Sequence, residues 1–331
     1  MLRFFAHANY DFIGVRRYAY GVTALVMIPG LILVAFRGLD YSIEFTGGSL
    51  VQIHVNRAIS IGQVRGALDR GGVPGAEITS FGTASDFVIR ARLRDQQAVS
   101  QQEAQVTARQ VDTALTRAFG ASSYTRGRVE AVGPKVGAEL RSRALLAILA
   151  SFLVVLVYLA FRFEWRFGLA AVVATAHDIL TTLAFIAYMR LEVSLVLVSA
   201  ILTVVGYSLN DTIIIFDRTR ENLHKYKRDD LAGILNRSIN ETLPRSILTH
   251  TTTIAALLAL LIFAGEVIRP FAWVMLFGVF TGTFSSIYIA APILLLIEKR
   301  WPGHDARGVK ARVVAAGQST PAVRTDSLPT G

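Results

Sequence analysis

Two acidic residues, Asp178 and Asp211, stand inside long apolar stretches of the sequence, where water cannot solvate a carboxylate. Asp211 lies six residues before Asp217, and this spacing is about 9 Å along an α-helix. A carboxylate at such a depth in a membrane costs on the order of 3 kcal/mol. Residues that carry this cost face the interior of a helix bundle, where they serve in proton relays or in ion pairs. The chemistry that these residues offer is therefore proton transfer within a membrane.

The basic residue that matches Asp211 in depth is Arg245, at the start of the next apolar stretch. Two interpretations remain open. In the first, Asp211 and Arg245 form a permanent ion pair that fixes the register of two helices. In the second, Asp211 gains and loses a proton while Arg245 alternately neutralises it. Moving one charge through 100 mV supplies about 2.3 kcal/mol, which is comparable with the cost of re-pairing a buried ion. We expect Asp211 and Arg245 to form a proton path, supported by other polar side chains within or beside the membrane: Asn210, His177, Asp178, Thr249 and Asp217.

Two histidines lie close to this path. The sequence allows His177-Asp178 to be a proton-linked pair or a polar clamp between helices. Adjacent residues on a helix do not face each other, so the two need not act together. His250 is either a hydrogen-bonded packing residue or a group that titrates near pH 6.5. We expect no metal and no cofactor, because the sequence contains no cysteine and neither a metal-ligand nor a nucleotide-binding motif.

Membrane-spanning helices are needed to hold these side chains at depth. The sequence is 53% hydrophobic, and runs of about 18 or more apolar residues predict such helices. There are six runs: 18–36, 144–161, 167–188, 194–216, 246–264 and 271–297. We therefore predict an α-helical polytopic membrane protein. The first run is too long for a signal peptide and lacks a cleavage site, so we expect it to remain as the first helix.

The net charge of +10 could indicate a nucleic-acid partner, but its distribution indicates membrane topology instead. If the N-terminus is cytoplasmic, the cytoplasmic segments hold 18 Lys and Arg residues and the short loops opposite hold 2. Cytoplasmic loops carry this excess. We expect a cytoplasmic N-terminal segment over 1–17 and a cytoplasmic, disordered tail over 298–331.

Residues 37–143 differ in composition from the rest and predict an external α+β domain between the first two membrane helices. Its strands are expected at 49–55, 76–82, 86–92 and 124–132, with helices from Ser60 to Gly71-Gly72 and over 97–119. This β-α-β-β-α-β order is that of a ferredoxin-like fold. The predicted bundle then occupies 144–297.

Glycines punctuate both connections to this domain, and we expect them to form either hinges or tight joints. The connector residues are Glu44, Gly47, Gly48, Gly133, Pro134 and Gly137. Small residues at regular helical spacing also predict close packing between membrane helices. These packing residues are Gly206, Gly278, Gly282, Ser285 and Ser286.

Together these motifs resemble the SecF branch of the SecD/SecF family of protein-export membrane proteins, over about residues 18–298. The segments that carry the resemblance are Val205-Gly206-Tyr207-Ser208-Leu209-Asn210-Asp211-Thr212, Phe216-Asp217-Arg218, Arg220-Glu221-Asn222, His177-Asp178, Thr242-Leu243 with Arg245 and Thr249, Gly282 with Ser285-Ser286-Ile287-Tyr288, Phe45-Thr46-Gly47-Gly48, and Val132-Gly133-Pro134 with Gly137 and Glu139-Leu140.

The resemblance implies a fold of resistance-nodulation-division type in the bacterial inner membrane, in which the chain pairs with SecD in a pseudo-symmetric bundle. It implies association with the SecYEG channel, the ATPase SecA and often YajC, and use of the proton-motive force to pull unfolded preproteins across at a late stage. Asp211 and Arg245 match the family's proton-path aspartate and arginine, and a further carboxylate of that path belongs to SecD. The chain departs from the pattern at Ser42 and Glu44, where Gly and Asp are expected, and at His250, where a small hydroxyl residue is common.

Three other functions compete with this reading. A proton-coupled small-molecule exporter of the same superfamily usually carries two bundles and larger external domains in one chain. An intramembrane enzyme would need a general base beside a nucleophile, and the sequence places none, so we expect no enzymatic activity. A passive scaffold would use the polar residues for packing alone and would tolerate Asp211→Asn.

Overall fold

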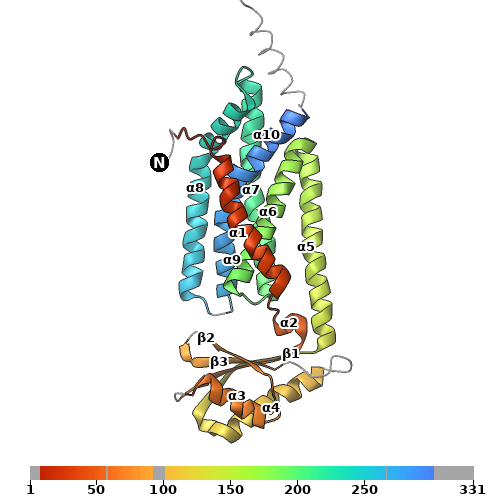
Figure 1. The fold of residues 1–331 in the computed structure, drawn as a ribbon, viewed down its shortest axis with the longest axis vertical. Coiled ribbons are helices and arrows are strands. Elements are labelled where there is room, and N and C mark those ends of the chain that lie inside the picture. Colours follow the sequence, from red (N-terminus) through yellow and green to blue (C-terminus); the bar gives the residue numbers. More distant parts are fainter. Residues whose placement is uncertain (1–7, 57–58, 82, 92–100, 266, 302–331) are drawn as a thin grey trace, which may run out of the picture.

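The structure is a computed structural model that describes residues 8–56, 59–81, 83–91, 101–265 and 267–301. Most of the expected C-terminal tail and the first seven residues of the expected N-terminal segment lie outside these ranges. The described residues form a long helical bundle with a small sheet domain at one end (Figure 1). We call this end of the bundle the domain end.

Among the described residues, six helical segments are long and apolar enough to cross a membrane. This confirms the predicted fold class. The segments are α1 (Arg16–Arg37), α5 (Pro134–Arg162), α6 (Trp165–Met189), α7 (Leu195–Lys225), α8 (Leu231–Phe263) and a last span over Arg269–Arg300. The last span consists of α9 (Arg269–Ser285), the π-helical segment η2 (Ser286–Ala290) and α10 (Ala291–Arg300).

Several helices run beyond the apolar segments that predict them. Helix α5 begins at Pro134, ten residues before the expected start, with proline in the first turn, where the missing N–H has no helical partner to lose. Helices α7 and α8 extend through most of the expected loop over 217–245, because polar helix-forming residues continue the helices past the apolar region. Asp230 caps α8 by accepting a 3.1 Å hydrogen bond from the Gly233 N–H.

The sheet domain has the predicted β-α-β-β-α-β order. Its elements are β1 (Gly48–Val55), α3 (Ile61–Arg70), β2 (Glu77–Phe81), β3 (Thr83–Ala91), α4 (Gln101–Phe119), the 3-10 turn η1 (Ala121–Ser123) and β4 (Tyr124–Val132). The sheet order is β2-β3-β1-β4, with every neighbouring pair antiparallel, as in a ferredoxin-like fold. Ser60 caps α3 in a reciprocal capping box with Gln63.

The core of the domain lies between the sheet and its two helices. Alternate residues of the strands, such as Val51, Ile53 and Ile89, are buried against Leu68 and Leu115. In Figure 1 the sheet lies between the bundle and helices α3 and α4. The opposite face of the sheet is therefore the one turned toward the bundle.

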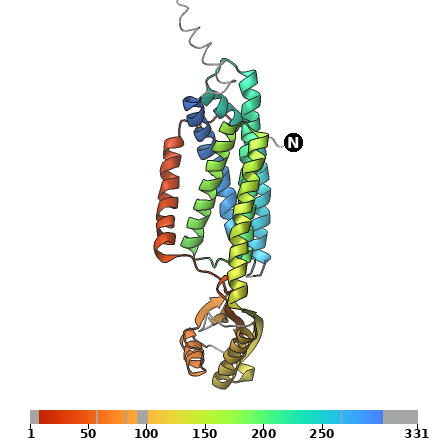
Figure 2. The same ribbon diagram turned by 90° about the vertical axis from the view of Figure 1, so that its right-hand side faces the viewer.

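The helices of the bundle differ in burial. More than half of the apolar windows of α6, α7 and the last span are buried, against less than a fifth for α1, α5 and α8. Figure 2 shows α1 at one edge of the bundle, with α5 and α8 toward the other edge. The central helices α6, α7 and α9 therefore provide the environment in which polar side chains are enclosed.

Candidate functional site

Asp211 is buried on helix α7, with 3% of its surface exposed. Its Oδ1 atom accepts a short hydrogen bond from the Ser246 hydroxyl of α8. Its Oδ2 atom is buried and has no hydrogen-bond partner among the residues that the structure describes. When this carboxylate is ionised, half of its charge lacks a donor, and leaving a buried polar atom unsatisfied costs about 1–3 kcal/mol, more for a charged group.

Arg245 does not form the expected ion pair with Asp211 in the described part of the chain. It lies on the exposed side of α8, while the next residue, Ser246, turns inward and reaches the carboxylate. Neighbouring helix positions point in different directions, so only one of the two can face Asp211 in this arrangement. A permanent Asp211–Arg245 ion pair is therefore absent from the described part of this structure.

His250 is enclosed between α7, α8 and α9. Its Nδ1 atom lies 2.9 Å from the Thr283 hydroxyl, and its ring centroid lies 5.6 Å from that of Tyr207. The Tyr207 hydroxyl donates to Thr253 Oγ1 at 3.1 Å. His250 is thus a hydrogen-bonded packing residue in this structure, and its titration stays a prediction.

A second polar cluster surrounds Asp178, which is completely buried on α6. Its Oδ2 atom accepts hydrogen bonds from Ser208 Oγ of α7 at 2.5 Å and from Ser285 Oγ of α9 at 2.7 Å. Its Oδ1 atom lies 3.1 Å from His177 Nδ1. The two adjacent side chains therefore contact each other in this structure, and their action as a proton-linked pair stays a prediction.

The serines of the last span have a larger role than close packing. Besides the Ser285 bond to Asp178, the Ser286 hydroxyl lies 2.7 Å from that of Thr212. Sequence reasoning did not single out Ser208, Thr212 or Ser246 as site residues. Helical spacing could have indicated Ser208 and Thr212, because positions 208, 211 and 212 share one face of α7.

The predicted packing glycines divide into two groups. A Cβ atom at Gly278 would lie 2.2 Å from Val204 Cγ2, and one at Gly282 would lie 2.9 Å from Ser208 Cβ. These two glycines therefore allow the close approach of α7 and α9. Gly206 lies on the outer side of α7 and has no such contact within 4 Å among the described residues, so its role in helix packing stays a prediction.

Gly206 belongs to an exposed row of small and polar residues on α7, which we call the α7 stripe: Ser199, Thr203, Gly206 and Asn210. On α8, Arg245 and Thr249 are also exposed. Asp217 lies further along α7, where it forms a half-exposed 2.5 Å ion pair with Arg162. Asn210, Thr249 and Asp217 therefore face outward and do not join the enclosed carboxylate.

The two glycine connectors pack directly against each other and form a neck between the domain and the bundle. Gly47 has φ 73° and ψ 157°, and a Cβ atom there would lie 2.8 Å from Pro134 Cα. A Cβ atom at Gly137 would lie 2.9 Å from the Gly47 nitrogen. Gly133 precedes α5 as its N-cap, and Gly48 begins β1 with φ 137°. The neck is a close joint in this structure, and its action as a hinge stays a prediction.

Glu44 connects this neck to the helix that carries Asp211. It lies in the short helix α2 (Ile43–Thr46), which Ser42 caps by accepting a 3.3 Å hydrogen bond from the Glu44 N–H. The Glu44 carboxylate accepts a 2.6 Å hydrogen bond from the Leu195 N–H at the start of α7. A negative charge is favourable at a helix N-terminus. The two residues that depart from the family pattern thus have structural roles: Ser42 caps α2, and Glu44 forms a hydrogen bond that connects the neck to the bundle.

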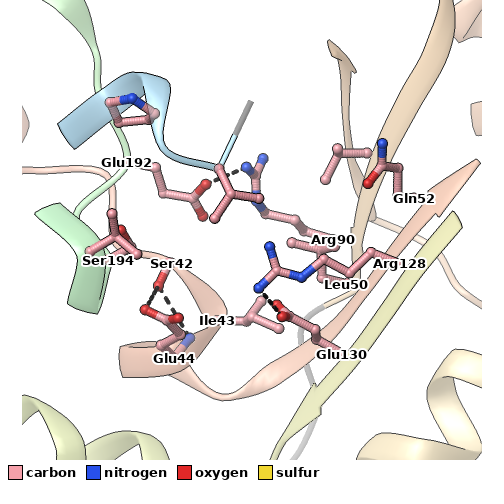
Figure 3. A pocket seen from close by; sticks show the side chains of 14 residues that line it. Ser42, Ile43, Glu44, Leu50, Gln52, Arg90, Arg128, Glu130, Glu192 and Ser194 are labelled. Atoms are coloured by element: carbon pink, nitrogen blue, oxygen red, sulfur yellow. Dashed lines mark hydrogen bonds and ion pairs between the residues drawn. The ribbon is translucent and has the colours of Figure 1, made fainter. Parts of the chain in front are cut away.

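A cavity of about 150 Å³ separates the sheet from the domain end of the bundle. Figure 3 shows Glu192, from the loop between α6 and α7, pointing toward Arg90 of β3, with which it forms an ion pair. Arg128 and Glu130 of β4 pair with each other on the same cavity. Burial raises the pKa of the Glu192 carboxyl, and the nearby Arg90 opposes this shift. Within the described ranges, no group of three or more His, Cys, Asp or Glu side chains could hold a metal ion.

Comparisons with known proteins converge on one family. The family described as "Protein export membrane protein SecD/SecF, C-terminal" matches residues 110–300, and "SecD/SecF GG Motif" matches residues 32–59. The protein translocase subunit SecF of Gemmatimonas aurantiaca is 56% identical over 96% of each chain. The protein translocase subunit SecF of Rhodobacter capsulatus is 41% identical over 87% of this chain and 89% of that one.

Two solved structures are similar as well. The crystal structure of SecDF from Thermus thermophilus has a TM-score of 0.78 and 33% identity over 90% of this chain. The crystal structure of SecDF in a super-membrane-facing form has a TM-score of 0.65 and 34% identity over 93% of this chain. The chain spans about 40% of the length of each of these SecDF chains.

Proposed function

Because the chain belongs to the SecD/SecF family of protein-export membrane proteins and is a SecF-type protein translocase subunit, we propose that it uses the proton-motive force to promote a late stage of preprotein translocation. In this proposal Asp211 is the proton carrier and Arg245 its alternating counter-ion. The energy comes from the proton gradient. The chain binds the unfolded preprotein without catalysing a reaction.

The observation that carries the proposal is the half-satisfied carboxylate of Asp211. One oxygen is bonded to Ser246, and the other is buried without a hydrogen-bond partner in the described ranges. A proton on Oδ2 removes the charge that lacks a donor. When that proton is lost, the ionised Oδ2 atom needs a new hydrogen-bond donor, and in this proposal Arg245 turns inward to provide it. Each protonation state therefore favours a different arrangement of α7 and α8, and a switch of this kind converts proton movement into conformational change.

We propose that SecD completes the site. The α7 stripe and the outward-facing Arg245 and Thr249 lie on faces that this chain leaves uncovered. Polar side chains in membrane helices face a bundle interior or a partner. The similar SecDF chains are about two and a half times as long as the part that this chain matches. A second bundle beside α7 and α8 would enclose the stripe and bring a further carboxylate to the path.

The proposed setting is the bacterial inner membrane. The Lys and Arg excess supports cytoplasmic termini, so the sheet domain lies on the opposite, extracytoplasmic side, where a preprotein emerges. The SecYEG channel, SecA and YajC are the proposed neighbours in the assembly. Unbiased copurification from membranes tests this part, because an exporter subunit would not recover SecD and the SecYEG channel.

The decisive experiment compares Asp211→Asn with a matched control, Glu221→Gln. Glu221 lies on the same helix, but it is exposed and bonded to Arg218. Each variant is co-reconstituted with SecD and the channel in vesicles, and completion of preprotein translocation is measured with and without an imposed proton gradient. We expect Asp211→Asn to lose the response to the gradient and Glu221→Gln to keep it. An intact response in Asp211→Asn, with normal assembly, would support a passive scaffold instead.

A further inference from the structure

We propose that His177 and Asp178 form a second proton-binding site in the bundle, and that gain or loss of its proton loosens or tightens the hold on helix α7, which also carries Asp211. This site is separate from the Asp211–Arg245 path. The coupling to α7 deepens the proposed function and rests on it, whereas proton binding by the pair does not.

The first support is the way in which Asp178 is held. Its hydrogen-bond partners come from three helices: His177 of α6, Ser208 of α7 and Ser285 of α9. Both serine hydroxyls point to the same oxygen, Oδ2. Hydrogen bonds to an ionised carboxylate are roughly twice as strong as bonds between neutral groups. The charge on Asp178 therefore determines how firmly α6, α7 and α9 are joined at this level.

The second support is His177, because both of its ring nitrogens have a hydrogen-bond partner. The imidazole can therefore gain a proton without a shift of its heavy atoms. His177 Nδ1 lies 3.1 Å from Asp178 Oδ1, and Nε2 lies 2.5 Å from the Thr23 hydroxyl of α1. A threonine hydroxyl can donate or accept. With neutral His177 and ionised Asp178, Nδ1–H donates to the carboxylate and Thr23 donates to Nε2.

When the pair takes up one proton, Nε2–H donates to Thr23 instead, because the threonine hydroxyl can rotate. If His177 carries the added proton, an imidazolium lies beside a carboxylate. If Asp178 carries it, a neutral imidazole lies beside a carboxylic acid. Both arrangements change the net charge of the pair from −1 to 0 and keep every heavy atom in place. The geometry therefore accommodates two protonation states of one cluster.

Few other charges act on this cluster. The groups that the neighbouring helices turn toward it are hydroxyls: Thr23 from α1, Ser208 from α7 and Ser285 from α9. Among the described residues, the ionisable side chain paired with Asp178 is His177. A gain or loss of a proton by the pair therefore changes the net charge of the cluster.

The connection to Asp211 runs through α7. Ser208, which bonds to Asp178, lies three residues before Asp211, which bonds to Ser246 of α8. The two bonds lie about one helical turn apart and attach α7 to α6 and to α8. A movement of α7 that changes the surroundings of Asp211 therefore also acts on the Ser208–Asp178 bond. When the proton lies on Asp178, the carboxylate charge is lost, so that bond weakens and the movement becomes easier.

The first test measures proton binding directly. The full chain with ¹⁵N-labelled histidine is placed in lipid nanodiscs, and the imidazole signals are followed between about pH 5.5 and 8.5, a range around the ordinary imidazole pKa of about 6.5. His177→Gln identifies the His177 signal by its loss. We expect that signal to change with pH, and its titration to shift in Asp178→Asn. A His177 signal that stays constant over the whole range overturns the proposal, even if Asp211 works as proposed.

The second test measures the coupling to α7. The chain has no cysteine, so a nitroxide label at Thr203→Cys, exposed on α7, reports the mobility of this helix. The label is introduced into a chain that also carries Asp211→Asn, so that titration of Asp211 cannot contribute to the response. We expect label mobility to increase on acidification, and this change to vanish when Asp178→Asn is added.

Two controls define the outcome of the second test. Thr175→Ala removes a buried hydroxyl of α6 that bonds to the carbonyl of Ala171 in its own helix, and it should leave the pH response intact. A label at Leu248→Cys, exposed on α8, should show no comparable response. The coupling is rejected if the response survives Asp178→Asn or is equally lost in Thr175→Ala.

Discussion

Replacing Gly47 by alanine tests whether the neck between the sheet domain and the bundle is the close joint that the connectors form. Two costs act at this position. The backbone conformation, φ 73° and ψ 157°, is one that residues with a side chain rarely adopt, and it costs about 1–3 kcal/mol. The new Cβ atom would lie 2.8 Å from Pro134 Cα and 2.9 Å from Pro134 N. Overpacking of this kind costs about 1–3 kcal/mol, so the expected total is roughly 2–6 kcal/mol.

Gly38 provides the control that separates these costs. Its backbone is similar, with φ 75° and ψ −173°, but no atom of the described residues lies within 4 Å of a Cβ built there. Gly38→Ala should therefore carry the backbone cost alone. The difference between the two variants isolates the clash with Pro134, expected at about 1–3 kcal/mol.

The assay is equilibrium unfolding of the purified chain in mixed micelles, followed by tryptophan fluorescence, with translocation measured on the same variants. We expect Gly47→Ala to be the less stable variant and to export less preprotein than Gly38→Ala at equal accumulation. Equal unfolding free energies for the two variants would refute the close joint, because backbone strain would then account for the whole effect.

Two further predictions concern the helix contacts and the domain contact. Gly278→Ala should destabilise the bundle by about 1–3 kcal/mol in thermal unfolding, because its Cβ would lie 2.2 Å from Val204 Cγ2. Adding Val204→Ala in the same chain should restore part of this loss of stability. As a control, Gly206→Ala should be neutral or stabilising by up to about 1 kcal/mol in the same assay. Burial raises the pKa of Glu192 above its ordinary 4.5 despite Arg90, so the docked domain binds this proton more tightly than a free domain does. Docking should therefore be strongest below about pH 4.5 and weaken as the pH rises through the raised pKa, as measured by hydrogen exchange in β3, and a pH dependence that persists in Glu192→Gln would contradict this assignment.

Much of the fold follows from local patterns in the sequence. The apolar runs predict the six spans because a helix that crosses a membrane needs about 20 apolar residues. The strand order of the domain follows from alternating residues and turn signals of short range. Asp211 can be singled out as a candidate site residue because a carboxylate in an apolar run is costly wherever its partners lie.

The rest depends on contacts between distant segments. The sequence places Arg245 at the depth of Asp211 but does not tell which side of α8 faces α7, and Ser246 takes the inward position. The bonds from Ser208 and Ser285 to Asp178 join residues 30 and 107 positions apart. Likewise, Glu44 reaches Leu195 across 151 positions. No local pattern encodes such pairs, because they arise only when the helices are assembled.

The exposed α7 stripe also bears on how many copies of this chain a cell can keep. A newly inserted chain without its partner presents two hydroxyls, an amide and the nearby Arg245 guanidinium to lipid or detergent. A guanidinium costs about 2.5–3.5 kcal/mol at the centre of a membrane helix and less near the end of an apolar stretch, where Arg245 lies, and polar side chains without partners there favour contact with any available donor or acceptor. We therefore expect a chain without its proposed partner to associate with other polar membrane helices through this surface, and a matched supply of the partner to prevent such association.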